Sequence, residues 1–450
     1  MSSRPDPQRP EPGAPGVPGP AEAVSPARAA RALALWSTAL RLALPLVFGR
    51  YLWRSRREPG YRQHLAERLG FGPVQAPGAL WVHAVSLGET RAAASLIEAV
   101  RARQPGLRLL LTHGTATGRE AGRALLREGD RQAWLPLDTP GAVRRFLRRQ
   151  KPALGVLMET EIWPNLLAEA EHAGVPMLLA NARLSERSAR RGERLAALMR
   201  PAAARLSEVL AQTADDAERL REGGARRVLL SGNLKFDMKP DPRLLAQGRA
   251  WRERLGRSVV LAAITREGEE AELLRAWGRT QGRNPFLLIV PRHPQRFDDV
   301  AALMLQNGLR VARRSSWADM PPAEALAVDA WLGDSLGEMP LYYACADVAL
   351  LGGSFAPLGG HNLIEAAACG CPLVMGPSTF NFAEAAQQSV EAGASWQEAD
   401  MGAAVRRSLQ VAHSELQTLA TSRALAFAGQ HRGAAARMAD RVVAWLGKAG

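Results

Sequence analysis

Short apolar runs alternate with longer amphipathic stretches after about residue 75, and this alternation constrains the fold more than any other feature of the sequence. A pattern of this kind predicts parallel β-sheets whose faces are covered by helices. The runs fall into two series, which indicates an α/β chain of two doubly wound domains. The first series is 79–85, 107–112, 132–136, 153–158, 176–180, 207–211 and 227–231, and the second is 258–263, 286–290, 309–312, 327–331, 347–351 and 372–375.

Composition changes outside these two series and indicates how the chain is divided. The first 30 residues are rich in proline and almost free of large apolar side chains, so they cannot form a core. Prolines cluster again between the two series, and the end of the chain, from about 401 to 448, has only helical patterns. We therefore expect a disordered tail at 1–30, an N-terminal anchor helix at 31–58, a first domain at 59–232, a linker at 233–246, and a second domain with terminal helices at 247–450.

Residues 31–53 are apolar over nearly the length that a membrane-spanning helix needs, about 20 residues. Arg41 and Pro45 interrupt this stretch, Tyr51 and Trp53 end it, and several arginines follow. Aromatic and basic residues are typical of helix ends at a membrane interface. We expect a membrane anchor that either spans the bilayer or lies in its headgroup layer. The alternative is an amphipathic helix packed on the protein itself.

The charge of the chain limits the partners that it can have. The formal net charge is +14, and arginine supplies nearly all of the positive charge. Such a surface favours phosphorylated or otherwise acidic partners. A nucleic-acid binder would need a concentrated basic face with exposed aromatic residues, whereas these arginines are dispersed, so we expect no nucleic acid as a partner. Three cysteines are too few for a disulfide framework and fit a reducing compartment.

Polar motifs follow strands of the first series, at the sheet edge where open parallel sheets bind ligands. Glu89 follows the first run and would be either a general base or only a helix cap. Glu159 and Glu161 follow the run at 153–158 and suit acid–base work or hydroxyl binding, unless they only form a helix entry. Arg183 follows the next run and could face a phosphate.

A second set of motifs follows strands of the second series. The densest lies between 351 and 376, where a run leads through glycine loops into a helix, and it favours a nucleotide-type site. His293 is either a ligand-binding residue or a structural hydrogen bonder, and Lys235 in the linker is either a site residue or the ion-pair partner of Asp237. The binding candidates of this half are Pro291, Arg292, His293, Leu336, Gly337, Glu338, Asn362, Leu363, Ile364 and Glu365.

Several common motifs are missing from the sequence. It contains no Asp-x-Asp, so a metal–diphosphate site is not expected, and Cys369 and Cys371 lack the partners that a zinc site needs. It contains no Gly-x-Gly-x-x-Gly, which disfavours a dinucleotide cofactor. We therefore expect neither a metal nor a cofactor.

Six motifs taken together resemble those of the 3-deoxy-D-manno-octulosonic acid (Kdo) transferases of Gram-negative bacteria. In chain order they are His-Ala-Val-Ser-Leu-Gly-Glu, Met-Glu-Thr-Glu-Ile-Trp-Pro-Asn, Asn-Ala-Arg-Leu-Ser-Glu-Arg-Ser, Gly-Asn-Leu-Lys-Phe-Asp, Pro-Arg-His-Pro and Gly-Gly-His-Asn-Leu-Ile-Glu. The resemblance covers roughly residues 31–430. It implies a GT-B fold, in which two Rossmann-like domains face a cleft, with the acceptor bound by the N-terminal domain and CMP-Kdo by the C-terminal one. It also implies an anchor at the cytoplasmic face of the inner membrane.

The resemblance implies a role for individual residues. Glu89 matches the proton acceptor of the family, and the Arg292, Leu336–Glu338 and Asn362–Glu365 segments match its CMP-binding segments. The expected reaction is a metal-independent transfer of Kdo, with inversion, from CMP-Kdo to the lipid A precursor; Glu159, Glu161, Arg183 and Lys235 are acceptor or transition-state candidates. The loop at 264–270 departs from the family, which usually has Ser-Thr-His-x-Gly-Glu-Glu there, whereas this chain has Ile-Thr-Arg-Glu-Gly-Glu-Glu.

Two other functions fit the same features less well. One is a membrane-associated GT-B transferase that uses a UDP-sugar. The other is a non-catalytic scaffold at the membrane surface with a relic nucleotide fold. Neither the number of Kdo residues transferred nor the oligomeric state follows from the sequence.

Overall fold

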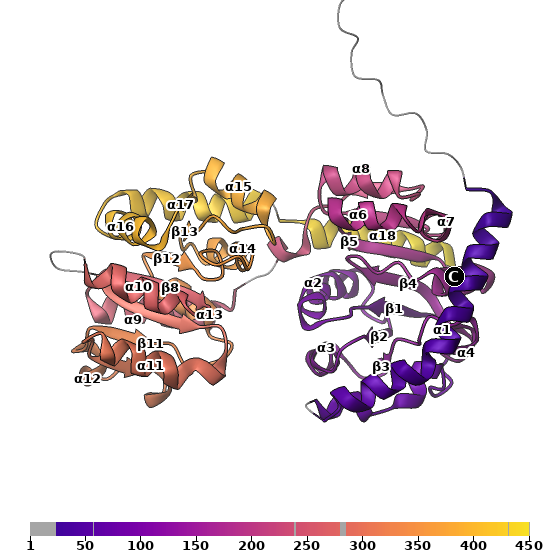
Figure 1. Cartoon of the computed structure of the whole chain (residues 1–450), viewed down its shortest axis with the longest axis horizontal. Coiled ribbons are helices and arrows are strands. Elements are labelled where there is room, and N and C mark those ends of the chain that lie inside the picture. Colours follow the sequence, from indigo (N-terminus) through magenta and orange to yellow (C-terminus); the bar gives the residue numbers. More distant parts are fainter. Residues whose placement is uncertain (1–23, 57, 238–239, 280–284, 431, 450) are drawn as a thin grey trace, which may run out of the picture. The chain divides into compact units, whose positions relative to one another are not determined.

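The computed structural model describes residues 24–56, 58–237, 240–279, 285–430 and 432–449, and the chain forms two compact α/β units (Figure 1). The first unit contains residues 1–90, 105–230 and 442–450, and the second contains residues 91–104 and 231–441. The second domain was expected to run to residue 450, but the last residues belong to the first unit, where the Trp445 indole donates a hydrogen bond of 2.7 Å to Glu208.

The described part of the first unit is built around a seven-stranded sheet in which all neighbouring strands are parallel. From edge to edge, its strands are β3 (Arg131–Trp134), β2 (Leu109–His113), β1 (Ala79–His83), β4 (Pro152–Met158), β5 (Met177–Ala182), β6 (Glu208–Ala211) and β7 (Val228–Leu230). Its helices are α1 (Pro26–Arg54), α3 (Ala116–Gly122), α4 (Pro140–Gln150), α5 (Pro164–His172), α6 (Glu186–Glu193), α7 (Ala196–Ala204) and α8 (Ala214–Glu222). Helix α2 (Leu87–Arg103) begins in the first unit, and from residue 91 it belongs to the second.

The described part of the second unit has a sheet of the same kind, again with seven parallel strands. From edge to edge, they are β10 (Val311–Arg313), β11 (Ala330–Leu332), β9 (Phe286–Pro291), β8 (Val259–Thr265), β12 (Val348–Leu351), β13 (Leu373–Met375) and β14 (Ser395–Gln397). Its helices are α9 (Pro242–Leu255), α10 (Glu269–Gly278), α11 (Phe297–Gln306), α12 (Ala323–Leu326), α13 (Met339–Cys345), α14 (Leu363–Ala368), α15 (Ala383–Glu391), α16 (Met401–Ala412), α17 (Leu416–Gln430) and α18 (Ala434–Ala449), the last of which ends in the first unit.

Burial explains why the sequence indicated nearly all of these strands. Every residue of β1, β2 and β12 is buried, as expected for parallel strands with helices on both faces, so each strand appears in the sequence as a continuous apolar run. The thirteen predicted runs match β1 to β13 with shifts of a few residues. β14 was missed because it is a short edge strand with only one large apolar residue, Trp396.

The predicted boundaries differ from the structure at two other places. The first helix begins at Pro26, inside the tail expected at 1–30; residues 1–23 of that tail lie outside the described residues. The linker expected at 233–246 contains a 3-10 helix at Leu234–Asp237 and the start of α9, while residues 238–239 lie outside the described residues. Asp237, the alternative ion-pair partner of Lys235, caps a helix: its carboxylate accepts the backbone N–H groups of Gly433 and Ala435 at the start of α18.

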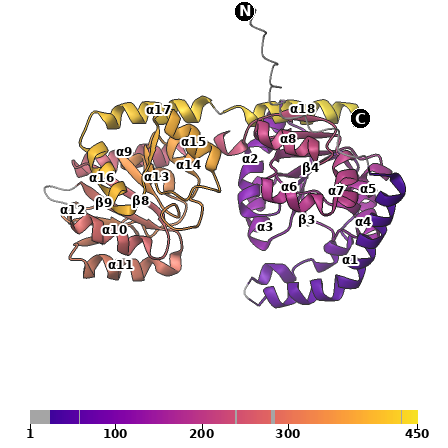
Figure 2. The same ribbon diagram turned by 45° about the horizontal axis from the view of Figure 1, so that its top comes forward.

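Helix α1 packs along the body of the first unit (Figure 2). About three turns into α1, the Ser37 hydroxyl donates a hydrogen bond of 2.7 Å to Asn165 Oδ1, and the Trp36 indole donates one of 3.1 Å to Asp138. Near its end, Arg68 donates a hydrogen bond of 3.2 Å to the Tyr51 hydroxyl. The helix is therefore held against the folded unit at its middle and near its end.

Candidate functional site

Glu89 lies in the first turn of α2, just beyond the carboxyl end of β1. Its Oε2 accepts a hydrogen bond of 2.7 Å from the Val85 backbone N–H, and its Oε1 accepts one of 3.1 Å from the Ser86 hydroxyl. Burial nevertheless raises the pKa of Glu89 to about 7, and the nearby carboxylates of Glu159 and Glu161 add to this increase. A carboxylate with this pKa can accept and release a proton near neutral pH, as a general base must.

Glu159 and Glu161 follow β4, which is the neighbour of β1 in the sheet. Glu159 is buried and has a φ of 59°, a left-handed conformation that is unusual for a residue other than glycine and that is frequent at functional sites. Its Oε2 lies 3.2 Å from Arg183 Nε, and Arg183 follows β5, the next strand. Glu161 Oε2 accepts a hydrogen bond of 2.7 Å from the Trp163 indole, and burial raises the pKa of Glu161.

His83, the last residue of β1, is a buried neighbour of these carboxylates that sequence reasoning did not select. Its Nδ1 lies 3.0 Å from the Thr112 hydroxyl, whereas its Nε2 lies 3.9 Å from Glu161 Oε2 and has no hydrogen-bond partner among the described residues. Burial lowers the pKa of His83 to about 3, so the ring is neutral. The ends of three adjacent strands thus bring Glu89, Glu159, Glu161 and Arg183 to one edge of the first sheet, with His83 beneath Glu161.

The second sheet carries a group of basic side chains at its carboxyl edge. Arg292 and His293 are exposed and follow β9, and the buried Pro291 ends that strand. Arg266 follows β8, and its Nη1 lies 2.9 Å from His293 Nε2. His361 follows β12; burial lowers its pKa to about 4, and the positive charges of Arg292 and Arg266 contribute to this decrease. Arg266 and His361 were not among the predicted site residues.

The remaining candidates of the second unit differ in whether their side chains are already paired with other residues or exposed. Glu338 is engaged by Arg314, whose Nε and Nη2 lie 2.9 Å and 2.8 Å from its two carboxylate oxygens. Leu336 and Gly337 are exposed beside it, beyond β11. Lys235 lies in the second unit, with its Nζ 5.0 Å from the centre of the Phe382 ring.

The segment from Asn362 to Glu365 forms the start of the short helix α14. Asn362 caps this helix, since its side-chain oxygen accepts a hydrogen bond of 3.2 Å from the Ile364 N–H. Leu363 and Ile364 are buried in the hydrophobic core, so only their backbone could touch a ligand. Glu365 is half-buried, and burial raises its pKa. Its carboxylate can accept hydrogen bonds from ligand hydroxyls.

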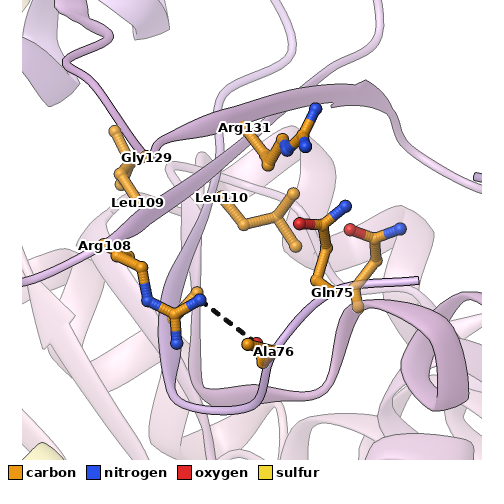
Figure 3. A pocket seen from close by; sticks show the side chains of 9 residues that line it. Gln75, Ala76, Arg108, Leu109, Leu110, Gly129 and Arg131 are labelled. Carbon is orange, nitrogen blue, oxygen red and sulfur yellow. Dashed lines mark hydrogen bonds between the residues drawn. The ribbon is translucent and has the colours of Figure 1, made fainter. Parts of the chain in front are cut away.

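A small pocket lies at the amino ends of strands of the first sheet, on the side opposite the carboxyl ends that carry Glu89 (Figure 3). It is formed at the amino ends of β1, β2 and β3, and Arg108 donates a hydrogen bond of 3.4 Å across it to the Ala76 carbonyl. None of the candidate residues lines this pocket. Within the described ranges, no group of three or more His, Cys, Asp or Glu side chains is placed to hold a metal ion.

Comparisons with known proteins agree on one family. A family model described as 3-deoxy-D-manno-octulosonic-acid transferase (kdotransferase) matches residues 63–238. The 3-deoxy-D-manno-octulosonic acid transferase of Bordetella pertussis is 46% identical over 432 residues, which cover 92% of this chain and 99% of the relative. The enzyme of the same name from Haemophilus influenzae is 34% identical over 79% of this chain and 84% of its own length.

The fold also has a counterpart among solved structures. A glycosyltransferase from Rickettsia africae aligns with 84% of this chain and 99% of its own chain, at a TM-score of 0.55 and 10% sequence identity. At this identity the likeness concerns the fold alone. Together with the two doubly wound sheets, it confirms the expected GT-B fold class.

Proposed function

This chain belongs to the family of Kdo transferases, and we propose that it transfers Kdo from CMP-Kdo to a hydroxyl group of the lipid A precursor. The similarity to the B. pertussis transferase, which extends over 92% of the chain, carries this proposal. The formal net charge of +14 is in keeping with an acidic donor and a phosphorylated acceptor. The direct test is whether the purified chain adds Kdo to this acceptor, with the mass of the product as the readout.

Glu89 is the proposed general base. It takes the proton of the acceptor hydroxyl while the oxygen forms a bond to the anomeric carbon of Kdo. The bond from that carbon to the phosphate oxygen breaks, and CMP leaves with the electron pair. Attack on the face opposite CMP gives inversion, through a transition state that resembles an oxocarbenium ion. The pKa of about 7 supports this role, because the ionised carboxylate that accepts the proton is well populated at neutral pH.

The groups around Glu89 are proposed to bind the acceptor. Burial keeps the pKa of Glu89 high, and the charges of Glu159 and Glu161 add to this effect. The oxygens of Glu159 and Glu161 are suited to accept hydrogen bonds from glucosamine hydroxyls. The Arg183 guanidinium is half-exposed beside Glu159 and is suited to a phosphate of the acceptor. For the second unit, we propose that Arg292 binds the CMP phosphate and that Glu365 accepts hydrogen bonds from the ribose hydroxyls.

Helix α1 is the proposed membrane-binding element, at the cytoplasmic face of the bacterial inner membrane. It is long and apolar enough to cross a membrane, but its contacts through Ser37 and Tyr51 hold it against the first unit. Its outer face carries an apolar stripe of side chains that are 60–78% exposed and recur at helical spacing: Leu35, Leu42, Leu46 and Trp53. We propose that this α1 stripe enters one leaflet while the helix lies in the plane of the interface, with its exposed arginines among the headgroups.

The variant L42E/L46E should lose most of its binding to vesicles that contain anionic lipid. Burial of one leucine side chain stabilises by roughly 1.5–3 kcal/mol, so loss of two should lower the partition constant at least about tenfold. Cosedimentation with phosphatidylglycerol-containing vesicles measures this change. The matched control is L305E/L419E, which adds the same charges at exposed leucines of the second unit and should bind like the wild type. Equal binding of all three proteins would contradict the role of the α1 stripe.

A further inference from the structure

Arg266 occupies the position at which the family motif usually has histidine, and its surroundings fix it at the carboxyl end of β8. Its backbone N–H donates a hydrogen bond of 2.9 Å to the Glu269 carboxylate. Its side chain runs past Gly353, where an added Cβ would lie 3.6 Å from Arg266 Cγ and 3.3 Å from the His361 ring. Its Nη1 donates to His293 Nε2 at 2.9 Å. Arg266 is therefore held between the loops that follow β9 and β12.

The acidic residues of this region are engaged elsewhere. Glu269 accepts hydrogen bonds of 2.8 Å from the Gly353 N–H and 3.2 Å from the Phe355 N–H, so its charge holds the glycine loop. Glu270 accepts hydrogen bonds of 2.7 Å from Arg296 and from the Thr265 hydroxyl. Glu267 is exposed, and its charge raises the pKa of Arg296. Within the described residues, neither Arg266 nor Arg292 forms an ion pair with a carboxylate.

Four basic side chains thus converge from three adjacent strands, β9, β8 and β12. Arg266 contacts the His293 ring directly and lies beside the His361 ring at Gly353, while Arg292 is the chain neighbour of His293. Burial lowers the pKa values of both histidines, and the positive charges of Arg266 and Arg292 add to this decrease. Because Arg266 donates to His293 Nε2, the neutral His293 ring carries its proton on Nδ1 and can donate from that atom. The result is a concentrated positive charge with free hydrogen-bond donors, which is the arrangement that binds an oxyanion.

We propose that Arg266, together with Arg292, binds the phosphate oxygens of the nucleotide donor. This inference rests on the proposed function, in which that donor is CMP-Kdo, and it adds a binding residue that the family motif does not contain. Arginine offers several N–H donors in a planar fork, so it can contact phosphate and still donate to His293. The altered loop at 264–270 then still binds phosphate, with Arg266 at the position where the family motif has histidine.

The test compares binding of CMP and of cytidine, which lacks the phosphate. Titration calorimetry with CMP should show at least a tenfold higher Kd for Arg266→Gln than for the wild type, since a hydrogen bond to a charged group is lost. Ligand-observed NMR should show unchanged binding of cytidine. Arg266→Lys keeps the positive charge but not the planar fork of N–H donors, so its Kd for CMP should lie between those of the wild type and Arg266→Gln. The matched control Arg275→Gln removes an exposed arginine of α10 and should bind CMP like the wild type.

Three results would count against the proposal in distinguishable ways. CMP affinity of Arg266→Gln equal to that of the wild type would overturn the phosphate role of Arg266 and leave the proposed function intact. An equal loss of CMP and cytidine binding would show that Arg266 acts on the nucleoside or on the fold, which also overturns it. Failure of the wild type itself to bind CMP would contradict the proposed function and this inference with it.

Discussion

Glu89→Gln is expected to lower kcat for Kdo transfer by roughly 10²–10⁴-fold, because the amide cannot take the proton of the acceptor hydroxyl. The substitution keeps the shape of the side chain and can still accept the hydrogen bond from the Val85 N–H. The affinity for CMP should stay within about twofold of the wild type. The measurement is the initial rate with CMP-Kdo and lipid A precursor, together with calorimetric titration of CMP.

Two controls separate lost chemistry from lost structure. Glu98→Gln makes the same change at an exposed position of the same helix and should leave kcat unchanged. The melting temperature of Glu89→Gln should equal or exceed that of the wild type, because burial disfavours the ionised form of Glu89 and the amide has no such cost. Wild-type turnover by Glu89→Gln would show that another group removes the proton.

The second large effect is a loss of activity in mild acid. Burial, with added repulsion from Glu159 and Glu161, raises the pKa of Glu89 to about 7, and the base acts in its ionised form. kcat/KM should therefore rise with pH up to about 7 and level off above it. Below the pKa it should fall about tenfold per pH unit, which makes activity at pH 5 about 100-fold lower than the plateau.

Removal of the negative charge of Glu161 should move the pH profile of kcat/KM to lower pH. Glu161→Gln takes away one carboxylate that raises the pKa of Glu89, so the midpoint should shift to lower pH while the profile keeps its shape. Glu98→Gln serves again as the control and should leave the midpoint in place. A profile that is flat between pH 5 and pH 8, or a midpoint that Glu161→Gln does not move, would contradict the assignment of Glu89 as the titrating base.

Much of the fold could be predicted because buried parallel strands appear in the sequence as continuous apolar runs. β1 and β12 are buried on both faces, so each run stands out from the amphipathic helices around it. β14 has a pattern of one buried, one half-buried and one exposed residue, and three such residues do not distinguish a strand from a loop. The return of the chain end to the first unit was not predicted either. This end is joined to the first unit by a hydrogen bond between Trp445 and Glu208, which are far apart in the sequence.

The candidate site was predictable to the extent that strand order brings motifs together. Glu89, Glu159 and Arg183 each follow a strand, and adjacent strands placed them side by side. Sequence reasoning did not assign the partners of individual side chains. Glu338 appeared available, yet Arg314 from another segment pairs with it. Arg266 appeared to be a departure from the motif, and its contact with His293 becomes visible only when β8 and β9 are paired.

The mass of the reaction product shows whether this chain transfers Kdo to the lipid A precursor. The purified chain is incubated with CMP-Kdo, generated in the same reaction, and with the tetra-acylated precursor. We expect a product whose mass exceeds that of the precursor by one or more Kdo residues, with Glu89→Gln giving little or none. An unchanged precursor in the wild-type reaction, with intact CMP-Kdo present throughout, would show that this chain does not transfer Kdo to the lipid A precursor.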